Sequence, residues 1–94
     1  MRVVWLRKAL QNLRDEAEFI ARDNPAAARE VVARIEHAAQ LLSDHPSLGR
    51  EGRVPGTREL IVPDTPYIVP YRVMDSRIVV LRVFHASRRL PSTW

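Results

Sequence analysis

The fold of this 94-residue chain follows from one stretch near its C-terminus, Tyr67-Ile-Val-Pro-Tyr-Arg-Val-Met74, Asp75-Ser76, Arg77-Ile-Val-Val-Leu-Arg-Val-Phe84. Two runs rich in Val, Ile and Tyr flank two turn-forming residues, which is the pattern of a β-hairpin. A third such run, Arg58-Glu-Leu-Ile-Val62, precedes them. The C-terminal third therefore predicts a three-stranded antiparallel meander.

A two-residue turn at 75–76 also predicts the register of the hairpin and its faces. The expected pairs are Met74 with Arg77, Tyr71 with Val80, Val69 with Arg82 and Tyr67 with Phe84. The side expected to pack on helices consists of Ile68, Pro70, Val79, Leu81 and Val83. The other side carries Tyr67, Tyr71, Arg82 and Phe84. This side is either a second core face or a binding surface. On a binding surface, a cation among aromatic rings would stack on nucleic-acid bases or contact side chains of another protein.

Pro70 sets a condition on its strand. Proline cannot donate a ladder hydrogen bond, so this strand is expected to lie near an edge or to be bulged at Pro70.

The N-terminal half predicts a short strand followed by two helices. Residues 2–6 form a short apolar run, and apolar residues then recur at helical spacing at Leu6, Leu10, Leu13, Ala17 and Ile20, with Phe19 widening the stripe. The charged residues Glu16, Glu18 and Arg22 are expected on the solvated face. A second stripe follows at Ala28, Val32, Ile35, Ala39 and Leu42.

The two helices are expected to form an antiparallel hairpin. Asn24 is a good N-cap and Pro25 suits the first helical position, so the connection between the stripes is short. The apolar side of such a hairpin needs a cover, and the sheet is the candidate. The predicted fold is therefore α+β: an N-terminal strand, an antiparallel helix hairpin and a three-stranded antiparallel meander, with the helices packed on one face of a small twisted sheet.

Residues 46–57 are predicted to form a loop. Glycines flank Arg50, Glu51 and Arg53, which lets the backbone approach a partner closely. The segment lacks the Gly-Lys-Ser/Thr ending of a phosphate-binding P-loop.

Composition predicts one domain over residues 1–94 in the cytoplasm. Residues 1–46 carry seven basic and seven acidic side chains, whereas residues 47–94 carry eight arginines and four acids, so the net charge of +4 arises in the second half. Arginine suits forked contacts with phosphate or carboxylate. The absence of cysteine excludes disulfides and thiolate catalysis, and no apolar stretch approaches the roughly 20 residues of a membrane span.

Three segments together resemble the RelE/ParE superfamily of bacterial toxins from type II toxin–antitoxin modules. They are 49–60 (GREGRVPGTREL), 66–73 (PYIVPYRV) and 83–91 (VFHASRRLP), and the order of elements matches that family over essentially the whole chain. The resemblance implies a growth-arresting toxin, as in modules for plasmid stabilisation. It also implies a cognate antitoxin that wraps the helices and the sheet. Operator DNA is expected to be bound only through this antitoxin. No cofactor, metal or membrane contact is expected.

The resemblance implies two different targets. RelE-like members cleave mRNA on the ribosome, whereas ParE-like members inhibit DNA gyrase. Cleavage without a metal requires a base, an acid and a cation that stabilises the phosphorane. If this chain is a nuclease, the implied catalytic residues are Glu51 as base, His85 as acid, and Arg58 and Arg89. Residues expected to contact the target are Arg53, Tyr71, Arg82, His85, Arg88 and Arg89.

The sequence departs from the nuclease pattern at two places. Ile68 follows Tyr67 where RelE-like nucleases carry an arginine, and Trp94 ends the sequence where they carry a catalytic tyrosine. The segment Phe84-His85-Ala86-Ser87-Arg88 is more similar to ParE. Gyrase inhibition is therefore the preferred hypothesis, with an mRNA endoribonuclease and an inactive antitoxin-binding protein as the alternatives.

Overall fold

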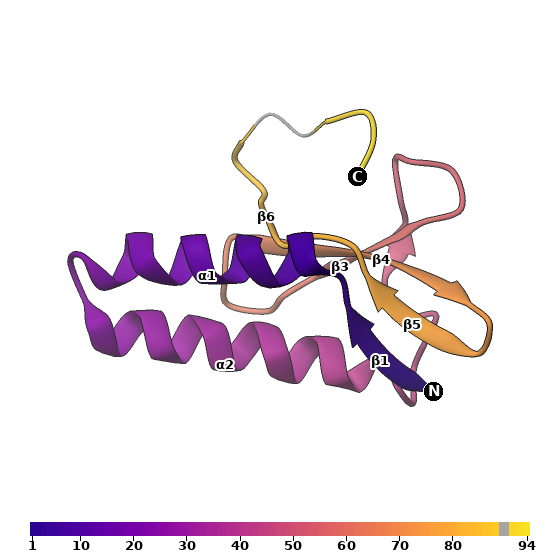
Figure 1. Cartoon of the computed structure of the whole chain (residues 1–94), viewed down its shortest axis with the longest axis horizontal. Helices are drawn as coiled ribbons and strands as arrows, with labels where there is room; N and C mark the ends of the chain where they lie inside the picture. Colours follow the sequence, from indigo (N-terminus) through magenta and orange to yellow (C-terminus); the bar gives the residue numbers. More distant parts are fainter. Residues whose placement is uncertain (89–90) are drawn as a thin grey trace.

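The computed structural model of this chain describes residues 1–88 and 91–94, which form two helices and a mixed sheet (Figure 1). In chain order the elements are β1 (Arg2–Trp5), α1 (Arg7–Ala21), α2 (Pro25–Leu41), β2 (Arg50–Glu51), β3 (Arg58–Ile61), β4 (Tyr67–Met74), β5 (Arg77–Val80) and β6 (Phe84–His85). The strand order is β1-β5-β4-β3-β2, and β6 pairs with β4 beyond β5. Strand β1 is parallel to β5 and the other pairs are antiparallel. The predicted α+β fold is confirmed.

The helix hairpin forms as predicted. Figure 1 shows α1 and α2 side by side and antiparallel, joined by a short turn. The Asn24 side chain accepts a hydrogen bond from the Ala27 N–H at 3.0 Å, and Pro25 occupies the first turn of α2. This cap satisfies one of the N–H groups that a helix start leaves without an intrahelical partner.

The core lies between the hairpin and one face of the sheet. Ala9 and Leu13 of α1 and Ile35 and Ala39 of α2 are buried in one cluster with the sheet residues Leu60, Val62, Tyr67, Val69, Tyr71, Ile78, Val80 and Val83. The buried side of α1 is rotated from the predicted stripe, because Leu6, Leu10 and Phe19 are exposed.

The assignment of the sheet faces was wrong for most residues. Tyr67 and Tyr71 were expected away from the helices, yet both are buried in the core against them. Strand alternation then places Ile68 and Pro70 on the opposite face, where they are also buried. Alternation shows which residues share a face, but both faces of β4 are apolar, so hydrophobicity could not show which one the helices cover. Val83, expected on the helix side, does belong to the helix–sheet core.

The hairpin register is confirmed near the turn and wrong beyond it. Asp75 and Ser76 have φ values of 52° and 58°, as a tight hairpin turn requires, and Met74 pairs with Arg77. Farther along, Tyr67 pairs with His85 rather than with Phe84, so residues 81–83 contain one extra residue.

Pro70 explains this bulge. The Leu81 N–H donates to the Pro70 carbonyl at 2.9 Å, but proline has no N–H with which to return the bond. The chain leaves the ladder there, and the Asn12 side chain of α1 accepts the Val83 N–H at 3.2 Å. Strand β4 is central in the sheet, so the expected edge position was wrong, and the bulge lies in the strand opposite Pro70 rather than in β4 itself.

The segment 46–57, predicted as a loop, contains the short strand β2. Arg50 and Glu51 pair with Glu59 and Arg58, respectively. Among the residues that the structure describes, no helix is long and apolar enough to cross a membrane.

Candidate functional site

Residues from three distant parts of the sequence meet where β6 ends. Glu16 lies on α1, Tyr67 begins β4, and His85 ends β6 directly opposite Tyr67. Arg88 follows the turn after β6. The one-residue bulge before β6 determines this meeting, because it puts His85 rather than Phe84 opposite Tyr67.

The Glu16 carboxylate is the centre of the cluster. It accepts two hydrogen bonds from the Arg88 guanidinium at 2.7 and 3.1 Å and a third from the Tyr67 hydroxyl at 2.9 Å. The Glu16 side chain is only 12% exposed, whereas Arg88 is 50% exposed. Burial would raise the pKa of the Glu16 carboxyl, but the bonds from Arg88 and Tyr67 and the charges of Arg88 and His85 outweigh it, so this pKa is lowered.

Tyr67 is held in its neutral form. Burial, followed by the hydrogen bond to Glu16 and the charge of Glu16, raises the pKa of the Tyr67 hydroxyl to about 12. Its hydroxyl therefore acts as a hydrogen-bond donor and not as a base at neutral pH.

The His85 ring is oriented from both sides. It packs edge-on against the Tyr67 ring, with centroids 5.2 Å apart and planes at 80°. Its Nδ1 accepts the Ser87 N–H at 3.2 Å and lies 2.6 Å from the Ser87 hydroxyl. Because Nδ1 accepts a hydrogen bond, the neutral ring carries its proton on Nε2.

A groove of about 420 Å³ opens beside this cluster. One wall is apolar and comes from Phe19 and Ile20 of α1 and Val31 of α2, together with Pro66. The other wall is polar and is lined by Tyr67, His85, Ser87 and Arg88. The groove can therefore hold an apolar side chain of a partner against the first wall and a hydrogen-bond acceptor of that partner against the second wall.

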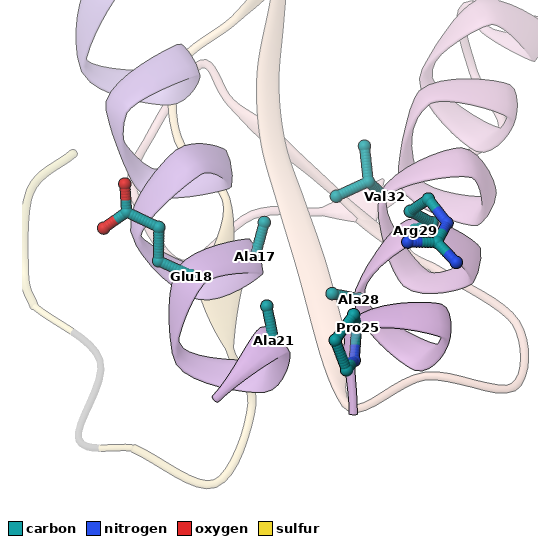
Figure 2. A pocket seen from close by; sticks show the side chains of 7 residues that line it. All are labelled: Ala17, Glu18, Ala21, Pro25, Ala28, Arg29 and Val32. Atoms are coloured by element: carbon teal, nitrogen blue, oxygen red, sulfur yellow. The ribbon is translucent and has the colours of Figure 1, made fainter. Parts of the chain in front are cut away.

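A second groove, of about 410 Å³, lies between the two helices (Figure 2). Ala17 and Ala21 of α1 and Ala28 and Val32 of α2 line it. Figure 2 shows the Glu18 carboxylate pointing away from the space between the helices. The groove between the helices therefore offers mainly apolar surface. Of these two grooves, the one beside Glu16 is the one with oriented polar groups.

The other two predicted catalytic residues within the described part of the chain lie elsewhere. Glu51 and Arg58 line a separate cavity of about 380 Å³. Arg58 pairs with Tyr71, four residues along β4 from the Tyr67–His85 pair, a separation of roughly 13 Å. The Arg58 guanidinium donates to the Gly49 carbonyl at 2.7 Å. Arg89 lies outside the described residues.

The predicted target-contacting residues are also dispersed. Tyr71 is fully buried, and its hydroxyl accepts the Gly49 N–H at 2.9 Å and donates to the Pro46 carbonyl at 2.7 Å. Arg53 binds the carboxylate of Glu59 at 3.3 Å, and Arg82 donates to the Trp94 carbonyl at 2.8 Å. Of the members of this set that the structure describes, only His85 and Arg88 line the groove beside Glu16.

Sequence reasoning missed Glu16 and Glu59. Glu16 was assigned to the solvated face, which is wrong, because it lies at the margin of the buried face, three residues after Leu13 and four before Ile20. That spacing was a usable signal. Glu59 is 2% exposed. Its carboxylate accepts hydrogen bonds from the Arg50 guanidinium at 3.1 Å and from the backbone N–H and the side chain of Arg53.

The fold and the site define a small α+β protein whose terminal strand brings a histidine and an arginine onto a carboxylate of the first helix. The family model of the ParE toxin of type II toxin–antitoxin systems (parDE) matches residues 3–90. The chain belongs to this family, within the RelE/ParE superfamily, and is a toxin of a type II toxin–antitoxin system.

Individual relatives agree with this assignment. The Y4kP protein of Sinorhizobium fredii is 42% identical over 90 residues, covering 96% of this chain and 93% of its own length. Toxin RelE2 of Caulobacter vibrioides is 33% identical over 86 residues, with coverages of 92% and 96%. A solved structure of the chromosomal ParDE system from P. aeruginosa superimposes with a TM-score of 0.83 at 28% identity, covering 93% of this chain and 97% of that one.

Proposed function

We propose that this toxin arrests bacterial growth by inhibiting DNA gyrase and that a cognate antitoxin neutralises it. The observation that carries the choice of target is Ile68. This residue stands where RelE-like nucleases carry an arginine, and it is 2% exposed on the sheet face away from the helices. A buried aliphatic side chain cannot stabilise a charged phosphorane.

The arrangement of polar groups supports the same conclusion. In the described residues, Glu51 and Arg58 lie too far along the sheet to act with His85 on one phosphate. Arg88, which lies near His85, is held by two hydrogen bonds to Glu16. The site is better suited to binding than to acid–base chemistry on RNA.

We place this chain and its antitoxin in the cytoplasm. Two features support an antitoxin that covers the chain. The matched structure is a ParDE toxin–antitoxin system, and the two grooves expose apolar surface from both helices. Apolar side chains of an antitoxin segment would gain about 25 cal/mol for each Å² that they bury there. In this proposal only the antitoxin recognises the operator sequence, so the toxin is held at the operator through the antitoxin.

The alternative is a ribosome-dependent endoribonuclease with His85 as acid, supported by the relative named RelE2. To act as the acid, His85 must carry protons on both ring nitrogens, and in this structure Nδ1 instead accepts the Ser87 N–H. Arg58, Glu51 and Arg89 would be its other catalytic residues.

Expression in bacteria distinguishes these activities. The chain is induced alone or with its antitoxin, and an SOS reporter, plasmid supercoiling and mapped mRNA ends are followed together. Gyrase inhibition predicts SOS induction and relaxed plasmid without new mRNA ends, all reversed by the antitoxin. Codon-phased mRNA cuts without SOS induction would overturn the proposal in favour of the nuclease, and unimpaired growth would indicate an inactive protein.

A further inference from the structure

Strand register places several arginines on the sheet face away from the helices. Residues that pair across strands share a face, as do residues two apart in one strand. Arg72 pairs with Val79, and Arg77, two residues before Val79, pairs with Arg2 of β1. These three arginines therefore lie on the face of Ile68, opposite Tyr71 and the helix core.

Three more arginines join this face. Glu59 pairs with Pro70, two residues before Arg72, and its carboxylate binds Arg50 and Arg53. Arg82 donates to the carbonyl of Trp94, whose ring packs on Phe84 at 5.8 Å. We define the arginine face by its six cationic residues, Arg2, Arg50, Arg53, Arg72, Arg77 and Arg82.

This face has a large charge excess. Two acids accompany the six arginines in the described strands and turns: Glu59, and Asp75, which is 3.8 Å from Arg77. The balance of six positive and two negative charges is +4, equal to the net charge of the whole chain. The remaining charges, most of them on the helix half, balance one another, so the excess is concentrated on one surface.

The pairing of Arg2 with Arg77 favours binding of an anion on this face. Arg2 and Arg77 are directly opposite each other in neighbouring strands and both are exposed, although like charges in that position destabilise a sheet. An anion bound between these two guanidinium groups relieves the repulsion.

The aromatic residues favour a duplex over a single strand. Single-stranded nucleic acids are bound by stacking bases on free aromatic rings. Here Phe84 and Trp94 pack on each other, and Tyr67 and Tyr71 are buried on the helix side. A duplex presents its phosphates outward and needs no stacking platform.

We propose that the arginine face binds the phosphate backbone of duplex DNA without reading its sequence. This binding belongs to the toxin chain itself and does not require the antitoxin. It goes beyond gyrase inhibition, and either activity can exist without the other.

The test is fluorescence anisotropy of a labelled duplex of mixed sequence with the purified chain, repeated over a range of salt concentrations. Glu59 does not bind four of the six arginines: Arg2, Arg72, Arg77 and Arg82. If each neutralises one phosphate, a plot of the logarithm of the binding constant against the logarithm of the salt concentration should have a slope of about −3.6. The double variant Arg2→Gln with Arg77→Gln should reduce this slope to about −1.8. A matched control, Arg14→Gln with Arg29→Gln, removes two exposed charges from the helices. It has the same net charge as the first variant and should keep the steep slope.

Three results would overturn the proposal: no binding to duplex at low salt, equal losses in both double variants, or tighter binding to single-stranded RNA of the same length. If the Arg2/Arg77 variant does not fold by circular dichroism, amide shift mapping on the unaltered chain replaces it. DNA should then shift β1 and β5 signals and leave the exposed side of α2 unchanged, whereas the reverse pattern would contradict the proposal.

Discussion

Glu16 and Arg88 are 72 residues apart in the sequence and are joined by two hydrogen bonds of 2.7 and 3.1 Å. The same carboxylate receives Tyr67, whose ring packs against His85. Glu16 thus ties the segment after β6 to the first helix. Any target that uses Arg88 must compete with an intramolecular carboxylate for it.

The first prediction concerns Glu16→Gln, which keeps the side-chain shape but removes its charge. The ion pair with Arg88 is lost, one of the two acceptor oxygens becomes an NH2 group, and the bond from Tyr67 becomes neutral. Since Arg88 is half exposed, we expect the free energy of unfolding to fall by about 1 to 2 kcal/mol. Urea unfolding measures the change. The matched control is the exposed neighbour Glu18→Gln, which should stay within about 0.5 kcal/mol. Equal stability of the two variants would contradict the role of Glu16.

The second prediction is a loss of stability in acid. Burial would raise the pKa of Glu59, but the Arg53 N–H and the Arg50 and Arg53 side chains outweigh it, and the pKa values of Glu16 and Glu59 are both lowered from 4.5. The folded chain therefore binds these protons more weakly than the unfolded chain. Their contribution to stability is complete above pH 4.5 and is lost as the pH falls through the folded-state values.

Urea midpoints measured from neutral to acidic pH provide the test. Glu59→Gln should flatten the acid limb of the profile, whereas Glu36→Gln, at an exposed position on α2, should leave it unchanged. Identical profiles for the two variants would exclude Glu59 as a source of the pH dependence.

The third prediction concerns the ionisation of Tyr67. With a pKa of about 12, this tyrosine should remain neutral well past the ordinary value of 10.0. Absorbance at the tyrosinate band follows the titration, and Tyr67→Phe identifies the transition. In Glu16→Gln the midpoint should move down, because the negative charge that opposes ionisation is gone. An unchanged midpoint in that variant, with the fold intact by circular dichroism, would disprove the coupling.

The fourth prediction concerns Tyr71→Phe. Its hydroxyl serves the Gly49 N–H and the Pro46 carbonyl, and the glycine is so close that an added Cβ would lie 2.6 Å from the tyrosine ring. Removing the hydroxyl leaves the buried Gly49 N–H and the partly buried Pro46 carbonyl unpaired, at a cost of about 1 to 3 kcal/mol. Thermal unfolding measures this cost. A Tyr71→Phe protein as stable as the parent would show that water replaces both bonds.

The sequence was sufficient for the elements whose signals are local. The Asn24-Pro25 start of α2, the apolar stripe of α2 and the turn at Asp75-Ser76 each depend on neighbouring residues, and each appears as expected. The α1 stripe predicted the helix but not its buried side, because Leu6, Leu10 and Phe19 are exposed. The bulge at residues 81–83 was foreseen only as one consequence of Pro70. The helix-covered face was missed because β4 is apolar on both faces.

The site was harder to predict because its contacts are long-range. His85 and Arg88 were named from the sequence, but their partner Glu16 is about 70 residues away and looked like a surface charge. Tyr71 was expected to contact a target because it is an aromatic residue on a strand, and only its burial shows that it supports the chain around Gly49. Spacing could have placed Glu16 at the margin of the buried face, but it could not show that Arg88 and Tyr67 would be its partners.

The most direct test of the central claim is DNA supercoiling by purified gyrase in the presence of the purified toxin. If the toxin inhibits gyrase, it abolishes supercoiling in a dose-dependent manner, the antitoxin restores supercoiling, and ribosome-bound mRNA stays intact at the same toxin concentration. Undiminished supercoiling together with cleavage of mRNA on the ribosome would contradict gyrase inhibition.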